Sequence, residues 1–256
     1  MSETAKPRFR VIDTGVRDGR RHIAFDAALI ELHKSGRSPD TVRFLRFPPT
    51  VLVGRHQDLA RDVRLEFCRA EGIGLARRIT GGGAIYLDEG QSGWEIVLSR
   101  RRLPMNSLDA YGRAISEAVA AGLEHAFGLP VRFRPPTDIV VADRKLCGTG
   151  GYFDGDTLVY QGTVLIDVDP VRISSVLNFP PPAANPTAPS PPRLTTLKAE
   201  LGSAVPDVAA VQRAVLDGLS GRLGLALDLG TPSAEEEQLA TQMHDTEIGT
   251  DDFVLG

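Results

Sequence analysis

The segment Arg77–Tyr86, Arg-Arg-Ile-Thr-Gly-Gly-Gly-Ala-Ile-Tyr, places three consecutive glycines between two apolar segments. Glycine loses more conformational freedom on folding than any other residue, so ordering three in a row is costly. Such a run is useful where the backbone must approach a ligand closely and point N–H groups at an anion. Arg77 and Arg78 could add charge-assisted hydrogen bonds to a phosphate or carboxylate. A glycine-rich hairpin beside two solvated arginines is the alternative, because the segment matches neither the Walker loop nor the dinucleotide-binding fingerprint.

Short apolar strands alternate with amphipathic helices on both sides of this segment. The predicted strands span residues 8–14, 41–47, 50–53, 75–78, 84–87, 94–98, 131–133, 139–141, 151–153 and 157–166. The predicted helices span residues 22–34, 63–71, 108–127, 208–223 and 234–241. We expect Ser107 to cap the helix over 108–127, and Asp154-Gly155-Asp156-Thr157 to form a hairpin turn. The pattern predicts an α+β fold in which a mixed or antiparallel sheet packs with helices.

The chain of 256 residues suits one domain, and we expect a single domain over residues 1–256.

A proline-rich segment interrupts the alternation of predicted strands and helices. Residues 179–193, FPPPAANPTAPSPPR, hold seven of the 18 prolines and cannot form regular structure. This proline-rich loop is either a passive linker or part of an active site, since long structureless loops inside compact domains are often functional.

The composition excludes several classes of protein. The 29 Lys and Arg against 33 Asp and Glu give a net charge of −4, which argues against broad nucleic-acid binding. No apolar run is long enough to span a membrane, and residues 1–10 lack the apolar part of a signal peptide, so we expect a cytoplasmic protein without a membrane partner. Two cysteines give no disulfide scaffold, and the five histidines lack metal-ligand spacing.

A second segment, Asp138–Gly150, carries candidate reactive groups. Lys145 lies between polar residues and a stretch of small ones, where its ammonium could hold negative charge on a carboxylate and a phosphate together. An ordinary surface lysine is the alternative. Cys147 could be a nucleophile beside Lys145, which shares its strand face if the strand is regular, or a small core residue. Farther along, Gly162 would permit close approach to a strand.

Several segments together resemble the lipoate–protein ligase A family, within the biotin/lipoate ligase and octanoyltransferase superfamily. Residues 77–86 resemble its RRxSGGGAVYHD motif. Further similar segments follow in the family's order: 44–58 (FLRFPPTVLVGRHQD), 138–149 (DIVVADRKLCGT), 161–167, 193–197 (RLTTL) and 249–256 (GTDDFVLG). Leu87 and Gln161 stand where the family has histidines. Because the resemblance covers nearly the whole chain, it implies the family's large catalytic domain without an accessory C-terminal domain.

The resemblance implies ATP-dependent ligation of lipoate, through lipoyl-AMP, to a lysine of a lipoyl carrier protein or domain. ATP and Mg²⁺ would be the cofactors and lipoate the substrate. Lys145 would be the catalytic cation that bridges the acyl carboxylate and the α-phosphate. The other implied binding residues are Arg78, Thr80, Gly81, Gly82, Gly83, Ala84, Ile85, Tyr86, Asp138, Gly148, Thr149, Gly162 and Thr163.

The same resemblance implies a separate accessory subunit as a possible partner. Two other functions stay open. The first is an ATP-independent octanoyl or lipoyl transferase that uses a Cys147 thioester, and the presence of this cysteine is its support. The second is a non-catalytic carrier-binding assembly factor, which the departures from the family motifs favour.

Overall fold

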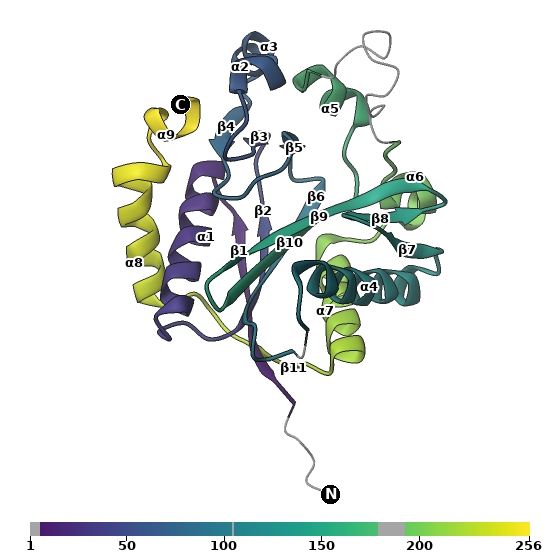
Figure 1. Cartoon of the computed structure of the whole chain (residues 1–256). Coiled ribbons are helices and arrows are strands. Elements are labelled where there is room, and N and C mark those ends of the chain that lie inside the picture. Colours follow the sequence, from purple (N-terminus) through teal and green to yellow (C-terminus); the bar gives the residue numbers. More distant parts are fainter. Residues whose placement is uncertain (1–5, 104, 179–192) are drawn as a thin grey trace, which may run out of the picture.

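The computed structural model describes residues 6–103, 105–178 and 193–256, and a mixed sheet of eight strands forms its centre. Figure 1 shows this sheet, whose strand order is β11-β1-β2-β6-β10-β9-β8-β7. β1 pairs in parallel with β11 and β2, and the other neighbours are antiparallel. The bounds are β1 (Arg8–Val16), β2 (Thr41–Arg46), β6 (Gln91–Ser99), β7 (Val131–Arg134), β8 (Asp138–Val141), β9 (Arg144–Asp154), β10 (Thr157–Leu165) and β11 (Ala226–Leu229). The α+β class is therefore confirmed.

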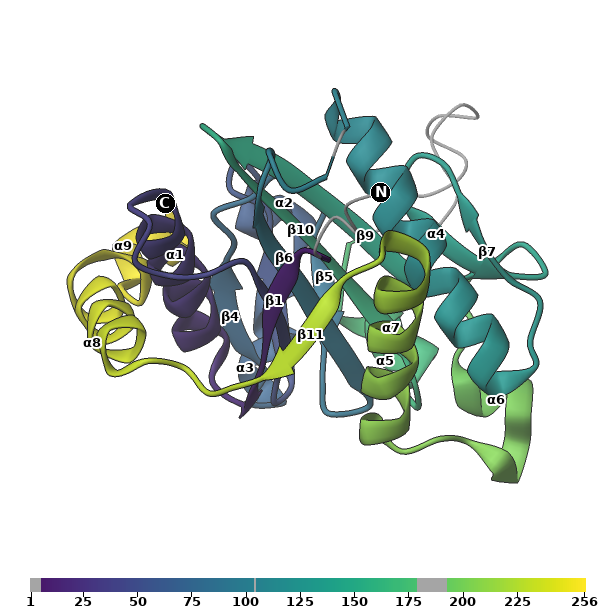
Figure 2. The same ribbon diagram turned by 90° about the horizontal axis from the view of Figure 1, so that it is seen from below.

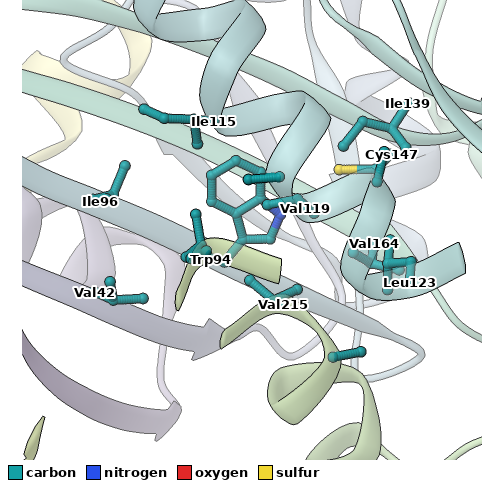
Figure 3. Packing of buried hydrophobic residues seen from close by; sticks show 14 of the residues in the cluster. Val42, Trp94, Ile96, Ile115, Val119, Leu123, Ile139, Cys147, Val164 and Val215 are labelled. Carbon is teal, nitrogen blue, oxygen red and sulfur yellow. The ribbon is translucent and has the colours of Figure 1, made fainter. Parts of the chain in front are cut away.

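Two helices cover one face of the large sheet, which we call the α4 face (Figure 2). They are α4 (Leu108–Phe127) and α7 (Val208–Leu223). Figure 3 shows how Trp94 of the sheet packs among Ile115 of α4 and Val215 of α7. These side chains are almost completely buried, so this cluster forms the main hydrophobic core.

Two other helices, α1 (Gly19–Lys34) and α8 (Ala234–Met243), lie side by side on the opposite face, the α1 face (Figures 1 and 2). Phe25 and Leu29 of α1 pack there against Val159 of the sheet. Asp18 caps α1 by accepting from the Arg20 N–H group.

A second sheet of three strands in the order β4-β3-β5 lies against the N-terminal half of α1. Its strands are β3 (Thr50–Val53), β4 (Gly74–Arg77) and β5 (Ile85–Leu87), and Leu52 packs against Ile23 of α1. The remaining elements are α2 (Leu59–Asp62), α3 (Leu65–Ala70), α5 (Pro170–Val176), α6 (Leu197–Leu201), the short helical turns Gly202–Ala204 and His244–Ile248, and α9 (Asp251–Leu255).

Most predicted elements are confirmed, but one predicted strand has the wrong bounds and another strand is missed. α4 has the predicted bounds and its Ser107 cap, and Gly155 has the positive φ of a hairpin turn. The strand predicted over 151–153 is only the end of the longer β9, and β11 was not predicted. Residues 179–192 of the proline-rich loop lie outside the described residues. No helix in the described part of the chain is long and apolar enough to cross a membrane.

Candidate active site

A cavity of about 1250 Å³ extends between the large sheet, α1, the small sheet and the loop that joins β4 to β5. Part of its wall is apolar and comes from Ile23, Leu45, Phe47 and Leu52. The volume exceeds that of ordinary small-molecule pockets, so the cavity can hold an extended ligand or two ligands side by side.

Lys145 brings a positive charge into this cavity from the start of β9. Its backbone N–H group donates to the Arg193 carbonyl at 2.7 Å, and its own carbonyl accepts from the Thr195 N–H group at 2.9 Å. A Cβ atom at Gly148 would lie 2.8 Å from Cε and 2.9 Å from Nζ of Lys145, so the missing side chain at Gly148 makes room for the lysine. These contacts fix the backbone of Lys145 and give its side chain the space that it occupies.

Asp138 holds the side chain of Lys145 without lining the cavity itself. Its Oδ1 atom lies 2.8 Å from Lys145 Nζ, and its Oδ2 atom accepts from Arg134 at 2.7 Å. Burial alone would raise the pKa of Asp138, but hydrogen bonds from the two cations outweigh that effect and lower it. The ionised carboxylate therefore orients the lysine.

The register of β9 turns Lys145 and Cys147 to opposite faces of the sheet. Cys147 pairs with Ile139 but Lys145 pairs with Val140, so Leu146 is an extra residue and forms a bulge. We expect Lys145 and Cys147 to share a face of the sheet only if the strand is regular, and the bulge makes it irregular. Cys147 packs in the core under α4 beside Ile139 (Figure 3), and burial raises the pKa of its thiol to about 12. Such a thiol is a poor nucleophile.

Gly81–Gly83 form an exposed part of the cavity lining. Within the described ranges, none of their backbone N–H groups donates to another residue, which leaves donors for an anion. The Arg78 guanidinium holds this loop in place by donating to the carbonyls of Gly81 at 3.1 Å, Gly83 at 2.9 Å and Leu52 at 3.1 Å. Burial lowers the pKa of Arg78 to about 10, so it stays charged at neutral pH.

The polar groups of Arg77 and Tyr86, which lie near this loop, bind other parts of the protein. The idea that Arg77 binds a phosphate is not supported, because its buried guanidinium donates to the carbonyls of Gln57 at 2.8 Å and Phe253 at 3.0 Å. It thereby ties the C-terminal helix α9 to the loop after β3. Tyr86 lines the cavity, but its hydroxyl accepts from Arg172 Nε at 3.1 Å.

A buried polar cluster on the α1 face also reaches the cavity and was not predicted. The fully buried Arg43 guanidinium contacts Asp26, lies 3.3 Å from Glu95 Oε1, and donates to His22 Nδ1 at 3.0 Å. Gln161 Nε2 donates to both carboxylates, and Asp26 and Gln161 line the cavity. The cluster draws on four elements, α1, β2, β6 and β10, and its members span residues 22–161. The available signal was a charged residue, Arg43 or Glu95, inside each of two otherwise largely apolar strands.

The structure brings the predicted site residues together. All of them except Asp138 line the cavity: Arg78, Thr80, Gly81, Gly82, Gly83, Ala84, Ile85, Tyr86, Lys145, Gly148, Thr149, Gly162 and Thr163. Neither of the two cysteines lines it, and both belong to the described part of the chain. Among the described residues, no group of three His, Cys, Asp or Glu side chains could hold a metal ion.

Comparisons with known proteins find consistent similarities. A family model described as the lipoyl protein ligase A/B catalytic domain matches residues 18–220. The octanoyltransferase LipM of Symbiobacterium thermophilum is 28% identical, over 96% of this chain and 97% of that protein. A crystal structure of lipoate-protein ligase A bound with ATP is similar at a TM-score of 0.83 and 25% identity, covering 98% of this chain and 99% of that one. A bi-partite lipoate protein ligase from Thermoplasma acidophilum, described with its E2 lipoyl domain, gives a TM-score of 0.82 at 26% identity and covers 98% and 96%.

Proposed function

Because this chain belongs to the lipoyl protein ligase A/B catalytic domain family, we propose that it joins lipoate to a lysine of a carrier domain through lipoyl-AMP. Membership of the family makes it an enzyme of lipoyl or octanoyl attachment to proteins. The adenylate route is the part that we propose. The observation that carries it is the position of Lys145 in one cavity with the Gly81–Gly83 loop and an apolar wall.

In the first half-reaction, a carboxylate must approach the α-phosphate of ATP although both are negatively charged. Lys145 is a cation fixed at both its backbone and its ammonium group, so it can hold the two anions together without reorganising. The N–H groups of Gly81–Gly83, which donate to no other residue that the structure describes, add donors for phosphate oxygens. Arg78 keeps this loop in the shape that presents them.

In the second half-reaction, the lysine of the carrier attacks the acyl carbon and AMP leaves. The apolar wall of Ile23, Leu45, Phe47 and Leu52 can hold the acyl chain and keep water away from the reactive acyl group. Lys145 would stay beside the acyl oxygen and the departing phosphate, where negative charge develops.

Mg²⁺ would bind mainly through the substrate. Mg²⁺ prefers oxygen ligands and commonly keeps water and nucleotide phosphates around it. Since the described residues supply no cluster of three carboxylates or histidines, its remaining ligands would be phosphate oxygens of ATP and water.

Octanoyl transfer without ATP is the second candidate. The names of several curated relatives, each an octanoyltransferase LipM, agree better with this function than with ATP-dependent ligation. Its thioester form requires a nucleophilic cysteine. The pKa of the buried Cys147 thiol is raised and Cys147 does not line the cavity, and both observations argue against that residue as the nucleophile.

One experiment separates these functions. The protein is incubated with a lipoyl domain that carries an unmodified lysine, and the mass of that domain is measured. One reaction supplies lipoate and ATP, and another supplies octanoyl carrier protein without ATP. We expect modification in the first reaction and its loss in Lys145→Ala. Modification only in the second would establish octanoyl transfer. A domain that stays unmodified in both, also when candidate accessory subunits are added, would favour a non-catalytic factor.

A partner polypeptide is also part of the proposal. The similar Thermoplasma acidophilum ligase is described as bi-partite and together with an E2 lipoyl domain. By analogy, a lipoyl domain would be the acceptor, and a separate accessory subunit would speed formation of lipoyl-AMP. A rate that is unchanged by candidate subunits would argue against the accessory part.

A further inference from the structure

Asp26 and Glu95 are buried carboxylates that compete for one cation. Their side chains are 5% and 0% exposed, and the Arg43 guanidinium contacts both. His22 adds no charge, because burial, and then the charge of Arg43, lower its pKa to about 3. Two negative charges and one positive charge in a closed environment are unbalanced, and one proton on the carboxylate pair would balance them.

This pair is connected to the cavity on the side that holds the catalytic lysine. Asp26 lines the cavity, as does Gln161, whose Nε2 atom lies 3.2 Å from Asp26 Oδ2. Alternation along β10 puts Gln161 and Thr163 on the same face. Thr163 pairs with Gly148, and the side chain of Lys145 lies over Gly148. Asp26 and the Lys145 ammonium therefore approach a bound ligand from the same side of the sheet.

Acyl transfer to a lysine needs a proton acceptor in the cavity, close to the bound acyl group. A lysine side chain is an ammonium ion at neutral pH, and only the free amine has the electron pair that attacks carbon. Two carboxylates line the described cavity: Asp109, which is exposed at the start of α4, and Asp26. Asp138 is held ionised by two cations. Burial raises the pKa of Asp26, and burial together with the charge of Asp26 raises the pKa of Glu95 to about 7, which suits proton exchange near neutral pH.

We propose that the Asp26–Glu95 pair is the proton acceptor for the incoming lysine, with Asp26 as the catalytic group and Gln161 as a positioning residue. This inference rests on the proposed function. With the pair in its unprotonated form, which is populated near neutral pH, one proton passes from the ammonium to the pair and balances its charge against that of Arg43. The amine then forms the N–C bond while the C–O bond to AMP breaks, and AMP leaves with that electron pair. The second nitrogen proton goes to solvent as the amide forms, and the pair later returns its own proton to water.

Hydroxylamine offers a direct test, because it is uncharged at neutral pH and attacks an acyl-adenylate without first losing a proton. Purified lipoyl-AMP is given to the protein with either the lipoyl domain or hydroxylamine, and amide and hydroxamate are measured in single turnovers. We expect Asp26→Asn to slow transfer to the domain by about 100-fold, within the range for general base catalysis. Hydroxamate formation should stay within about twofold of the wild type, since that reaction needs no general base.

Two further variants keep the test decisive. Glu95→Gln removes the other member of the pair and should give the same selective loss, so it replaces Asp26→Asn if that variant does not fold. Glu236→Gln is the matched control, because Glu236 is a buried carboxylate that is paired with Arg10 and does not line the cavity. It should leave the ratio of the two products unchanged.

The outcomes are distinct. Equal slowing of both reactions in Asp26→Asn and Glu95→Gln, or unchanged transfer to the domain, would overturn the proton-acceptor role alone. Wild-type protein that forms no amide from lipoyl-AMP would overturn the proposed function and this proposal with it.

Discussion

Replacing Lys145 with alanine should remove most of the rate of lipoyl-AMP formation and little of the stability. The ammonium is the cation that Asp138 holds at 2.8 Å and that the cavity exposes to a ligand. A unit charge about 4 Å from an anion contributes about 4 kcal/mol at the effective dielectric constant of a protein site. That energy corresponds to a rate loss of about 10³-fold.

The stability loss should be much smaller. The Lys145 side chain is 27% exposed, and Arg134 still pairs with Asp138 after the substitution. A partly exposed ion pair contributes about 1 kcal/mol or less. Pyrophosphate release and thermal unfolding, measured on the same preparation, therefore separate chemistry from folding.

Lys198 supplies the matched control. Its Nζ atom lies 2.7 Å from Asp167, a similar ion pair, but it does not line the cavity. Lys198→Ala should change pyrophosphate release by less than about twofold, as expected of a surface ion pair. If Lys145→Ala releases pyrophosphate within tenfold of the wild-type rate, the reasoning about a fixed catalytic cation is wrong.

Three more predictions follow from particular contacts. Cys147→Ser should retain carrier modification while unfolding at a lower temperature, because a hydroxyl replaces a thiol in the core; an acyl-thioester trapped on Cys147 would contradict this. Gly148→Ala should reduce pyrophosphate release at least tenfold by displacing the Lys145 side chain, whereas Gly221→Ala, where an added Cβ meets nothing within 4 Å, should not; equal activity in the two variants would refute the steric argument. The raised pKa of Glu95 means that the folded protein keeps a proton that the unfolded chain loses above its ordinary value of 4.5, so the free energy of unfolding should fall as pH rises from there to about 7. Glu95→Gln should flatten that slope in denaturant titrations at several pH values, and an unchanged slope would assign it to another group.

Local sequence signals were enough to predict those helices and strands whose ends carry a capping or turn residue. Ser107 and the apolar pattern after it predicted α4, and Asp154-Gly155 predicted the hairpin between β9 and β10. β9 was predicted only in part, since its glycines lower strand propensity. Gly148 is explained by a contact that only the folded chain shows, the space needed by the Lys145 side chain.

The candidate site also has a part that could be predicted from the sequence and a part that could not. The glycine segment and Lys145 were found because the reacting groups lie within short segments that resemble a known family. The cluster around Arg43 was missed because its members come from α1, β2, β6 and β10, and no spacing in sequence connects them. The opposite directions of Lys145 and Cys147 also could not be predicted. The single extra residue between them in β9 turns their side chains to opposite faces of the sheet, and nothing in the sequence marks that bulge.

The mass of the acceptor domain tests the proposed chemistry most directly. A lipoyl domain with an unmodified lysine is incubated with the protein and lipoate, with and without ATP, and in a further reaction with octanoyl carrier protein and no ATP; the domain is weighed after a fixed time. We predict that the domain gains one lipoyl group only when ATP is present, in the wild type and in Cys147→Ser but not in Lys145→Ala. A domain that is modified from octanoyl carrier protein without ATP, and not from lipoate with ATP, would contradict the adenylate mechanism.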